Sequence, residues 1–268
     1  MKVYVISLRS AADRRTFQQA QLTRLDLEYN IVDAVSTTDL GQFEATIALD
    51  RWERPFMPTE VACFFSHYKI WQQMAVSQEP ALVLEDDALL SSEVPAFLKQ
   101  VQRLEGLDHI SLETRLRKKL LGRTHLLQPG MGIARKYQDR TGAAAYILWP
   151  TGAQKLVRHA LGHGAALADA FISNLYSLNS WQATPALAVQ SDVSANYGIS
   201  SQLQTHSYIQ ANDCKANYAI SGLSGLAFKL RRIASQLRQA RRFLAHIAHA
   251  RRIQVPVMAQ TFDNTKTP

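Results

Sequence analysis

The sequence has 268 residues, 47% of them hydrophobic, and a formal net charge of +8. A chain of this length and composition can bury a substantial core, so we expect one large α/β domain, or one domain with an appendage. Its two cysteines, Cys63 and Cys214, lie far apart and exclude a cysteine-based metal or disulfide framework, which favours a reducing, cytoplasmic setting. The N-terminus lacks a signal-peptide pattern, and no stretch approaches the ~18–20 apolar residues of a membrane span.

The positive charge is concentrated near the C-terminus. Nine Lys or Arg residues and no Asp or Glu lie between Cys214 and Phe262. The rest of the chain carries 21 basic and 22 acidic residues, so it is close to neutral. The basic character therefore belongs to a tail and not to the body of the protein.

Apolar runs near the N-terminus predict strands at residues 3–8 and 28–32, with a helix between them that ends at about Arg24. Free backbone N–H groups at the start of this helix, with arginines close by, could bind a phosphate or a uracil. These arginines are Arg9, Arg14 and Arg15, of which the last two could equally be ordinary surface charges. Little supports a dinucleotide site, because no G-x-G-x-x-G motif occurs.

Residues 36–58 lack clear periodicity and predict a loop or small insert over the site. The next helix begins at Pro58, and its apolar residues recur at helical spacing, which predicts that it packs on the sheet. His67 lies within this helix. A lone helix histidine is more often a structural hydrogen-bonding residue than a ligand contact, and both interpretations stay open.

The chain's most informative stretch is the apolar run at residues 81–84, which leads straight into Glu85, Asp86 and Asp87. The run is too short for a helix and predicts a buried strand. Its acids repel one another, and at the carboxyl end of a central strand they lie where open α/β sheets bind ligands. Their oxygens suit Mg²⁺ or Mn²⁺, which would offset the repulsion. The alternative is a solvated acidic turn.

Beyond this triplet, the sequence predicts a helix over residues 93–104 and a strand over residues 108–112. A further carboxylate, Glu113, follows that strand directly. Residues 116–140 are basic and irregular, and we interpret them as a mobile acceptor or lid loop.

Gly142 lies in a run of small residues that predicts a tight turn feeding a strand, where backbone can approach a ligand closely. Helices are expected over residues 153–161 and about 170–179, and a late strand over residues 185–190. Asp169 lies at the start of the second helix. It is either an N-cap or a group that binds and deprotonates an acceptor hydroxyl.

Residues 191–220 are polar and loop-like, with His206 as a further candidate ligand. Residues 226–253 predict a long, cationic amphipathic helix, or two. Its apolar stripe consists of Leu226, Leu230, Ile233, Leu237, Ala240, Leu244 and Ile247. This helix has three possible functions: attachment to an anionic membrane surface, a dimer seam and nucleic-acid binding. Nucleic-acid binding ranks last, because aromatic residues do not interleave with the basic ones.

Taken in order, the motifs resemble glycosyltransferase family 25, the bacterial lipooligosaccharide galactosyltransferases. The matching pieces are Val5 to Leu8 with Asp13 to Arg15, Asp33 to Val35, Glu60 to His67, Leu84 to Asp87, Leu112 to Thr114, Thr141 to Ile147, Ala168-Asp169 and Pro185 to Leu187. The family's basic C-terminal tail also has a counterpart here. One departure is Leu167-Ala168-Asp169, where relatives often have Pro-Val-Asp.

The resemblance implies a GT-A-like α/β fold, with a mixed, mostly parallel central sheet flanked by helices. The catalytic domain would span residues 1–220, and the basic helical tail residues 221–268. It also implies an inverting, metal-dependent transfer of a hexose, usually galactose from UDP-galactose, to a lipid-linked saccharide acceptor of lipooligosaccharide or lipopolysaccharide.

The resemblance assigns roles to single residues. Asp87, assisted by Asp86, would hold Mn²⁺ or Mg²⁺, and Asp169 would be the catalytic base. Glu113 is the second candidate base, or a group that binds sugar hydroxyls. The expected donor-binding residues are Ser7, Leu8, Arg9, Arg15, Ala34, Val35, His67, Glu85, Asp86 and Gly142.

The expected partners are a UDP-sugar, the saccharide acceptor and, through residues 226–253, the inner face of a bacterial cytoplasmic membrane. A homodimer is the alternative use of the tail, and no nucleic acid is expected. Three other functions stay open: transfer from UDP-glucose or a UDP-N-acetylhexosamine, a metal-dependent nucleotidyltransferase, and a non-catalytic membrane scaffold. The nucleotidyltransferase is weakened because a Gly/Arg/Lys-rich N-terminal loop is missing.

Overall fold

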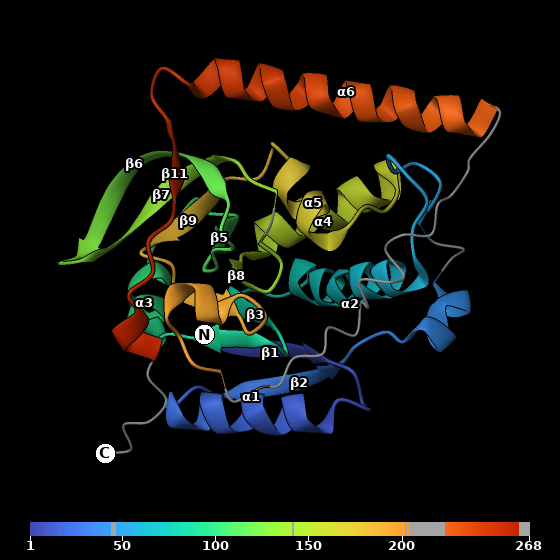
Figure 1. Ribbon diagram of the computed structural model, residues 1–268. Coiled ribbons are helices and arrows are strands. Elements are labelled where there is room, and N and C mark those ends of the chain that lie inside the picture. The colour runs from blue at the N-terminus through green and yellow to red at the C-terminus, as the bar shows by residue number, and fades with distance from the viewer. Residues whose placement is uncertain (44–46, 141, 202, 204–222, 263–268) are drawn as a thin grey trace.

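The computed structural model describes residues 1–268 except 44–46, 141, 202, 204–222 and 263–268 (Figure 1). A mixed sheet forms its centre. In sheet order, its strands are β11 (Arg251–Gln254), β6 (Lys118–Gln128), β7 (Met131–Gln138), β9 (Ser180–Thr184), β5 (His109–Ser111), β8 (Ala145–Leu148), β3 (Ala81–Glu85), β1 (Lys2–Ser7) and β2 (Tyr29–Asp33). Strands β7, β8 and β11 run opposite to the others. Most strands thus share one direction, which confirms the predicted fold class.

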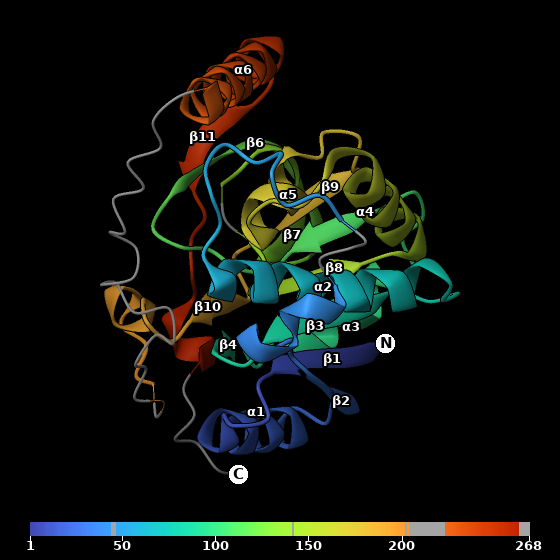
Figure 2. The same ribbon diagram turned by 90° about the vertical axis from the view of Figure 1, so that its right-hand side faces the viewer.

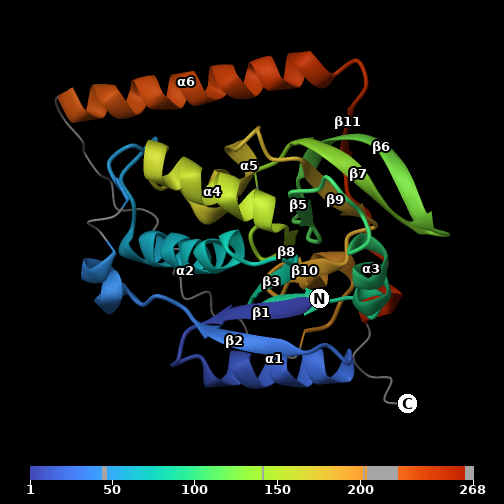
Figure 3. The ribbon, with the colours of Figure 1, turned by 180° about the vertical axis from the view of Figure 1, so that it is seen from behind.

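Helices cover both faces of this sheet (Figures 2 and 3). They are α1 (Ala12–Arg24), α2 (Pro58–Ala75), α3 (Val94–Val101), α4 (Pro150–His163), α5 (Ala168–Asn174) and α6 (Leu223–His246), with short 3₁₀ turns at Thr37–Gln42, Ser194–Tyr197 and Ala259–Phe262. A second, short sheet pairs β4 (Ala88–Leu90) with β10 (Ala188–Gln190). The helices and sheet together give three layers.

Alternation along the central strands creates two separate cores, because successive side chains point to opposite faces. Tyr4 and Ile6 of β1 pack under α2, α4 and α5. Val3 and Val5 of the same strand pack against α1 and α3 on the other face. A buried strand of this kind reads as a continuous apolar run, which is why β1 and β3 were predictable from sequence.

Residues 116–140 are not the irregular loop that we expected. They form a long hairpin in which β6 pairs with β7, and β7 joins the sheet through β9. Irregular pairing between Leu121 and Thr124 breaks the alternation. Lys119 and Lys136 are buried within these strands, although lysine side chains are normally exposed to solvent. Both features hide the strand pattern.

The C-terminal segment also differs from the expectation. Helix α6 ends at His246, and residues 251–253, which were expected to be helical, belong to the edge strand β11 beside β6. Val255, just after this strand, is buried. The predicted strand at residues 185–190 is reduced to β10, and β9 precedes it unpredicted. The division of the chain at residue 220 stays a prediction.

No helix in the described part of the chain is both long enough and apolar enough to span a membrane. Helix α6 is the outermost helix in the figures and runs above α5 and the β6–β7 hairpin (Figures 1 and 2).

The packing of α4 on the sheet predicts a large effect of one methyl group. A Cβ at Gly152 would lie 2.3 Å from the carbonyl oxygen of Asp108, which is backbone and cannot move aside cheaply. We expect Gly152→Ala to lower the free energy of unfolding by about 2 kcal/mol or more in a denaturant titration. Gly162, in the same helix, has nothing within 4 Å of its would-be Cβ. Gly162→Ala should therefore leave stability unchanged or raise it by up to about 1 kcal/mol, and an equal loss in both variants would contradict the packing argument.

Candidate active site

The parallel strands β1, β2 and β3 end at one edge of the sheet and bring three predicted segments together. Ser7 at the end of β1 is in register with Asp33 of β2, and Ile6 is in register with Glu85 of β3. The Ala34 N–H donates to the carbonyl of Ser7 at 2.9 Å. The N-terminal loop, residues 33–35 and the acidic triplet therefore form one site, at the edge where sequence analysis placed it.

Asp86 is tied to the first strand and helix. Its two carboxylate oxygens accept from Ser7 Oγ at 2.7 Å and from the Arg14 guanidinium at 2.9 Å, and the residue is only 9% exposed. Gln18 Nε2 donates to the Asp86 carbonyl at 3.2 Å. Asp86 thus fixes the β1–α1 loop against the acidic triplet.

Arg9 and Arg15, both expected to bind the donor, converge on Asp33. Arg15 donates to Asp33 Oδ1 at 2.6 Å and to the carbonyls of Ser7 and Leu8 at 2.8 and 3.0 Å. Arg9 donates to Asp33 Oδ2 at 2.7 Å. The hydrogen bonds from Arg15 and Arg9 lower the pKa of Asp33. These side chains therefore shape the nucleotide-side loop, with Leu8 held through its backbone.

Helix α2 holds the backbone of Val35 and supplies the His67 side chain. The Val35 N–H donates to Ser66 Oγ at 2.8 Å, and Ser66 in turn donates to the Ala62 carbonyl one helical turn back at 2.7 Å. The side chain of His67, the next residue, is fully buried and points into the site.

A chain of hydrogen bonds runs from Trp71 to Glu85. Trp71 Nε1 donates to the Tyr146 hydroxyl at 2.9 Å, and that hydroxyl lies 2.9 Å from His67 Nδ1. His67 Nε2 lies 3.1 Å from Glu85 Oε1. Burial raises the pKa of Tyr146, so it remains a phenol. The Trp71 indole can only donate, so the Tyr146 hydroxyl accepts from it and can donate its own proton to His67 Nδ1. His67 Nε2 then carries the ring proton and donates to Glu85. Trp71 was expected only in the core, and Tyr146 was not singled out at all.

Asp87 has the features of a cation ligand. Its Oδ1 is buried and has no hydrogen-bond partner among the described residues. Burial, and then the charge of Glu85, raise the pKa of Asp87 to about 7. An unpartnered, buried carboxylate oxygen is a hard, anionic ligand of the kind that Mg²⁺ and Mn²⁺ prefer.

A second possible donor set is less suitable. Ligand atoms of Cys63, His67 and Glu85 lie within 4.8 Å of one another. Burial, and then the charge of Glu85, raise the pKa of the Cys63 thiol well above its usual value. Because only the thiolate is a good ligand and His67 already holds Glu85, the oxygens around Asp87 are the better candidates.

The two candidate bases, Asp169 and Glu113, face the same region, and both have a raised pKa. Asp169 Oδ1 accepts from the Ala143 N–H at 2.8 Å, and burial with the Glu85 charge raises the pKa of Asp169 to about 6. Glu113 is 2% exposed, and burial followed by the charge of Asp169 raises its pKa well above the usual value. Burial therefore raises the pKa of both candidate bases, and the charge of Asp169 adds to the rise at Glu113.

Gly142 is required where it lies. Its φ of +127° is a conformation that side chains rarely adopt, and a Cβ there would lie 3.3 Å from Ser111 Oγ and 3.8 Å from Glu113 Oε1. The backbone thus passes close to Glu113 at Gly142, and the next residue, Ala143, contacts Asp169.

A buried charge network that sequence reasoning missed lies behind Glu113. Lys119 Nζ donates to the Glu113 carbonyl at 2.9 Å and to Gln182 Oε1 at 2.7 Å, and it pairs with Asp139 at 2.8 Å. Lys136 lies 3.6 Å from the same Asp139 oxygen, and burial lowers the pKa of Lys136 to about 8 despite that pairing. Lys119, Lys136 and Asp139 lie within residues 116–140, which were interpreted as a loop, so nothing in the sequence marked them. His206 lies outside the described residues.

The fold and this acidic site define an α/β enzyme, and the comparisons with known proteins identify its class. Residues 1–167 match the family described as "Glycosyltransferase family 25 (LPS biosynthesis protein)". That match covers more than half of the chain. The protein is a glycosyltransferase, and it belongs to glycosyltransferase family 25, which confirms the resemblance seen in its motifs.

Three relatives show how far the similarity reaches. The "Lipooligosaccharide biosynthesis protein lic2B" of Haemophilus influenzae is 27% identical over 207 residues, which cover 70% of this chain and 75% of the relative. The "Lacto-N-neotetraose biosynthesis glycosyltransferase LgtB" of Neisseria meningitidis is 33% identical, covering 37% of this chain and 38% of the relative. "Procollagen galactosyltransferase 1-B" of Xenopus laevis is 34% identical, covering 32% of this chain and 16% of the relative.

Asp86 is paired and Asp87 is not, so replacing each by Asn should change the free energy of unfolding in opposite directions. In metal-free buffer, the pKa of Asp87 is higher in the folded state than in the unfolded chain, so its contribution to stability is lost as pH rises from about 4 to about 7. Asp87→Asn should therefore raise the free energy of unfolding by about 1–3 kcal/mol at pH 8 and by only about a third as much at pH 5. Asp86→Asn should lower it by about 1–3 kcal/mol, because the ion pair with the half-buried Arg14 is lost.

Denaturant titrations at the two pH values check both effects, with a chelator present throughout. Destabilisation by Asp87→Asn at pH 8, or stabilisation by Asp86→Asn, would show that the two carboxylates have been assigned the wrong environments.

Proposed function

We propose that the protein is an inverting, metal-dependent galactosyltransferase that uses UDP-galactose and acts on a saccharide acceptor of lipooligosaccharide or lipopolysaccharide. Family membership supports sugar transfer, and relatives named for galactosyl transfer and lipooligosaccharide synthesis support the donor and the acceptor class. The observation that carries the proposal is that two buried carboxylates serve different ends of the site. Asp87 has an oxygen without a partner, and the pKa of Asp169 is raised to about 6.

The donor side of the site uses the parallel strands. Asp87, assisted by Asp86 or Glu85, would hold the Mn²⁺ or Mg²⁺ ion, which when bound neutralises charge on the departing diphosphate. The loop formed by Ser7, Leu8, Arg9 and Arg15, with the backbone of residues 34–35, orients the nucleotide. His67 keeps Glu85 in place from the opposite side.

Asp169 acts on the acceptor side. It takes the proton of the acceptor hydroxyl as the new bond to the anomeric carbon forms and the bond to the UDP oxygen breaks, so the configuration inverts in one displacement. The Ala143 N–H orients the carboxylate. Glu113, whose pKa is raised by burial, binds a sugar hydroxyl. The raised pKa values agree with these roles, because a base works best when its pKa lies near the working pH.

The orientation of α6 favours the membrane over a core-facing role for its apolar stripe. Leu230, Leu237 and Leu244 are 57%, 65% and 70% exposed. The opposite side of the helix faces the body: Ser235 is buried, and Arg242 donates to the Tyr137 carbonyl at 3.1 Å. The exposed stripe and the flanking cations suit an anionic lipid surface. We therefore infer that the enzyme works at the inner face of the cytoplasmic membrane, near a lipid-linked acceptor.

Replacing the base should separate binding from chemistry. We expect Asp169→Asn to lower kcat at least about 100-fold, because general-base catalysis is lost, while UDP affinity with Mn²⁺ stays at the wild-type value. Glu113→Gln, which keeps polar atoms that can bind a sugar hydroxyl, should lower kcat far less. Near-wild-type turnover in Asp169→Asn would eliminate it as the base.

The proposed function itself is tested by a panel of UDP-sugars, scored for hydrolysis and transfer with and without Mn²⁺. UDP-galactose should be the preferred donor, and Asp87→Ala should remove the metal-dependent part of UDP binding. Preference for UDP-glucose or a UDP-N-acetylhexosamine would correct the donor, and use of a nucleoside triphosphate alone would favour nucleotidyl transfer.

Polar substitutions on the exposed stripe should release the protein from membranes. We expect Leu237→Ser with Leu244→Ser to reduce recovery on phosphatidylglycerol vesicles at least about tenfold, since roughly 2 kcal/mol or more of apolar burial is removed. Leu126→Ser, at a residue 72% exposed on the hairpin, is the matched control and should have no effect. A change from dimer to monomer in sedimentation, with unchanged vesicle recovery, would instead assign the stripe to a dimer seam.

A further inference from the structure

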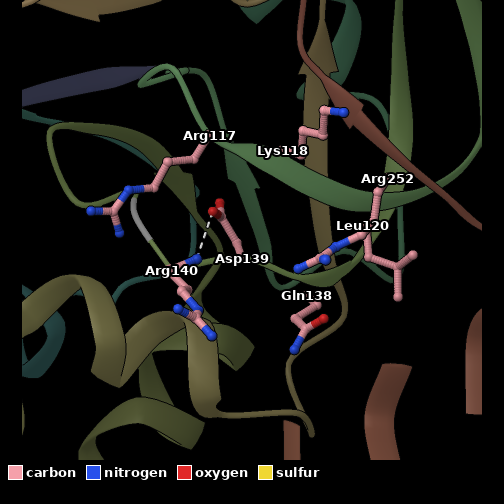
Figure 4. Close-up of a pocket in the computed structure, with 7 residues that line it drawn as sticks. All are labelled: Arg117, Lys118, Leu120, Gln138, Asp139, Arg140 and Arg252. Carbon is pink, nitrogen blue, oxygen red and sulfur yellow. Dashed lines mark hydrogen bonds between the residues drawn. The ribbon is translucent and has the colours of Figure 1, made fainter. Parts of the chain in front are cut away.

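A basic pocket opens between the start of the β6–β7 hairpin, the segment after β7 and strand β11 (Figure 4). It has a volume of about 390 Å³. Its cations come from three separate segments: Arg117 and Lys118 at the start of the hairpin, Arg140 after β7, and Arg252 on β11. The C-terminal segment therefore completes this pocket.

The pocket carries an uncompensated positive charge. Among the residues that the structure describes, Asp139 is its only lining acid, and this carboxylate is already paired with the buried Lys119 and Lys136. Within the described residues, Arg117, Lys118, Arg140 and Arg252 form no ion pair with an acid. Cations gathered around a hollow without acidic partners favour an anionic ligand.

The pocket connects to the candidate base. A neighbouring pocket of about 270 Å³ shares Arg117, Asp139 and Arg140 with it and is also lined by Ala170, the residue next to Asp169. Three residues beyond Arg140 in the sequence, Ala143 donates its N–H to Asp169. Because three extended residues span at most about 11 Å, an anion held by Arg140 lies within a short saccharide's reach of Asp169.

We propose that this pocket binds an anionic substituent, a phosphate or a carboxylate, on the acceptor saccharide, next to the sugar that receives the hexose. The inference rests on the proposed transfer reaction and names the acceptor's chemistry. Arginine suits the task because its planar guanidinium meets either anion with two parallel hydrogen bonds. The site thus selects acceptors by charge as well as by sugar.

Binding of disaccharides to the full-length protein, in the presence of UDP and Mn²⁺, tests this inference without requiring turnover. The probes are methyl β-lactoside, which is neutral, lactose 1-phosphate and lactobionate, a carboxylate. We expect at least one anionic probe to bind about tenfold more tightly than the neutral one, with an affinity that falls as salt is added. Arg117→Gln with Arg252→Gln should remove that preference, and Arg117→Gln alone should reduce it.

Arg123→Gln is the matched control, because Arg123 is an exposed residue of the same hairpin that does not line the pocket. Unchanged UDP binding shows that each variant is folded. Equal affinity for all three probes, or the same loss in the control, would overturn the inference. The inference would also be overturned if the double variant lost binding to phosphatidylglycerol vesicles but kept its preference for the anionic probe. The pocket would then bind lipid headgroups. Failure of every UDP-sugar in the donor panel would refute the proposed function and leave this binding result intact.

Discussion

Electrostatic repulsion among carboxylates at one edge of the sheet is the constraint on which this structure depends. Glu85, Asp86 and Asp87 follow one another at the end of a buried strand, and the charges of Asp169 and Glu85 contribute to the raised pKa of the buried Glu113. Burying so much like charge is costly unless each group is paired, protonated or bound to a cation. The surrounding residues use these solutions in different places.

Pairing accounts for the carboxylates that shape the site. Asp86 is neutralised by Arg14, and Glu85 accepts from the chain that begins at Trp71. Lys119 and Lys136 keep the pKa of Asp139 low even though burial opposes it. The carboxylates left without such partners are the ones with raised pKa values. Uncompensated charge therefore separates the residues that can do chemistry from those that hold them in place.

Sequence patterns predicted the parts of this arrangement that are local. The apolar runs of β1 and β3, the helix that begins at Pro58 and the acidic strand end each follow from the identity and spacing of neighbouring residues. The different roles of Asp86 and Asp87 do not, because they depend on which side chains of a distant helix reach each carboxylate. The β6–β7 hairpin was missed for a related reason: its buried lysines are explained only by Asp139, a partner that the fold supplies.

The sheet also divides the work of the protein between two halves. Parallel strands β1, β2 and β3 bring loops to one edge and build the proposed donor side, whereas the antiparallel strands β6, β7 and β11 build the basic pocket. Gly142 and Asp169 lie between these halves, beside β8, where strand direction reverses. Helix α6 runs over the second half with its polar side inward and its apolar stripe outward. If that stripe contacts lipid, the basic pocket is held next to the membrane surface, where an anionic, lipid-linked saccharide would meet it first and the donor would enter from the opposite half.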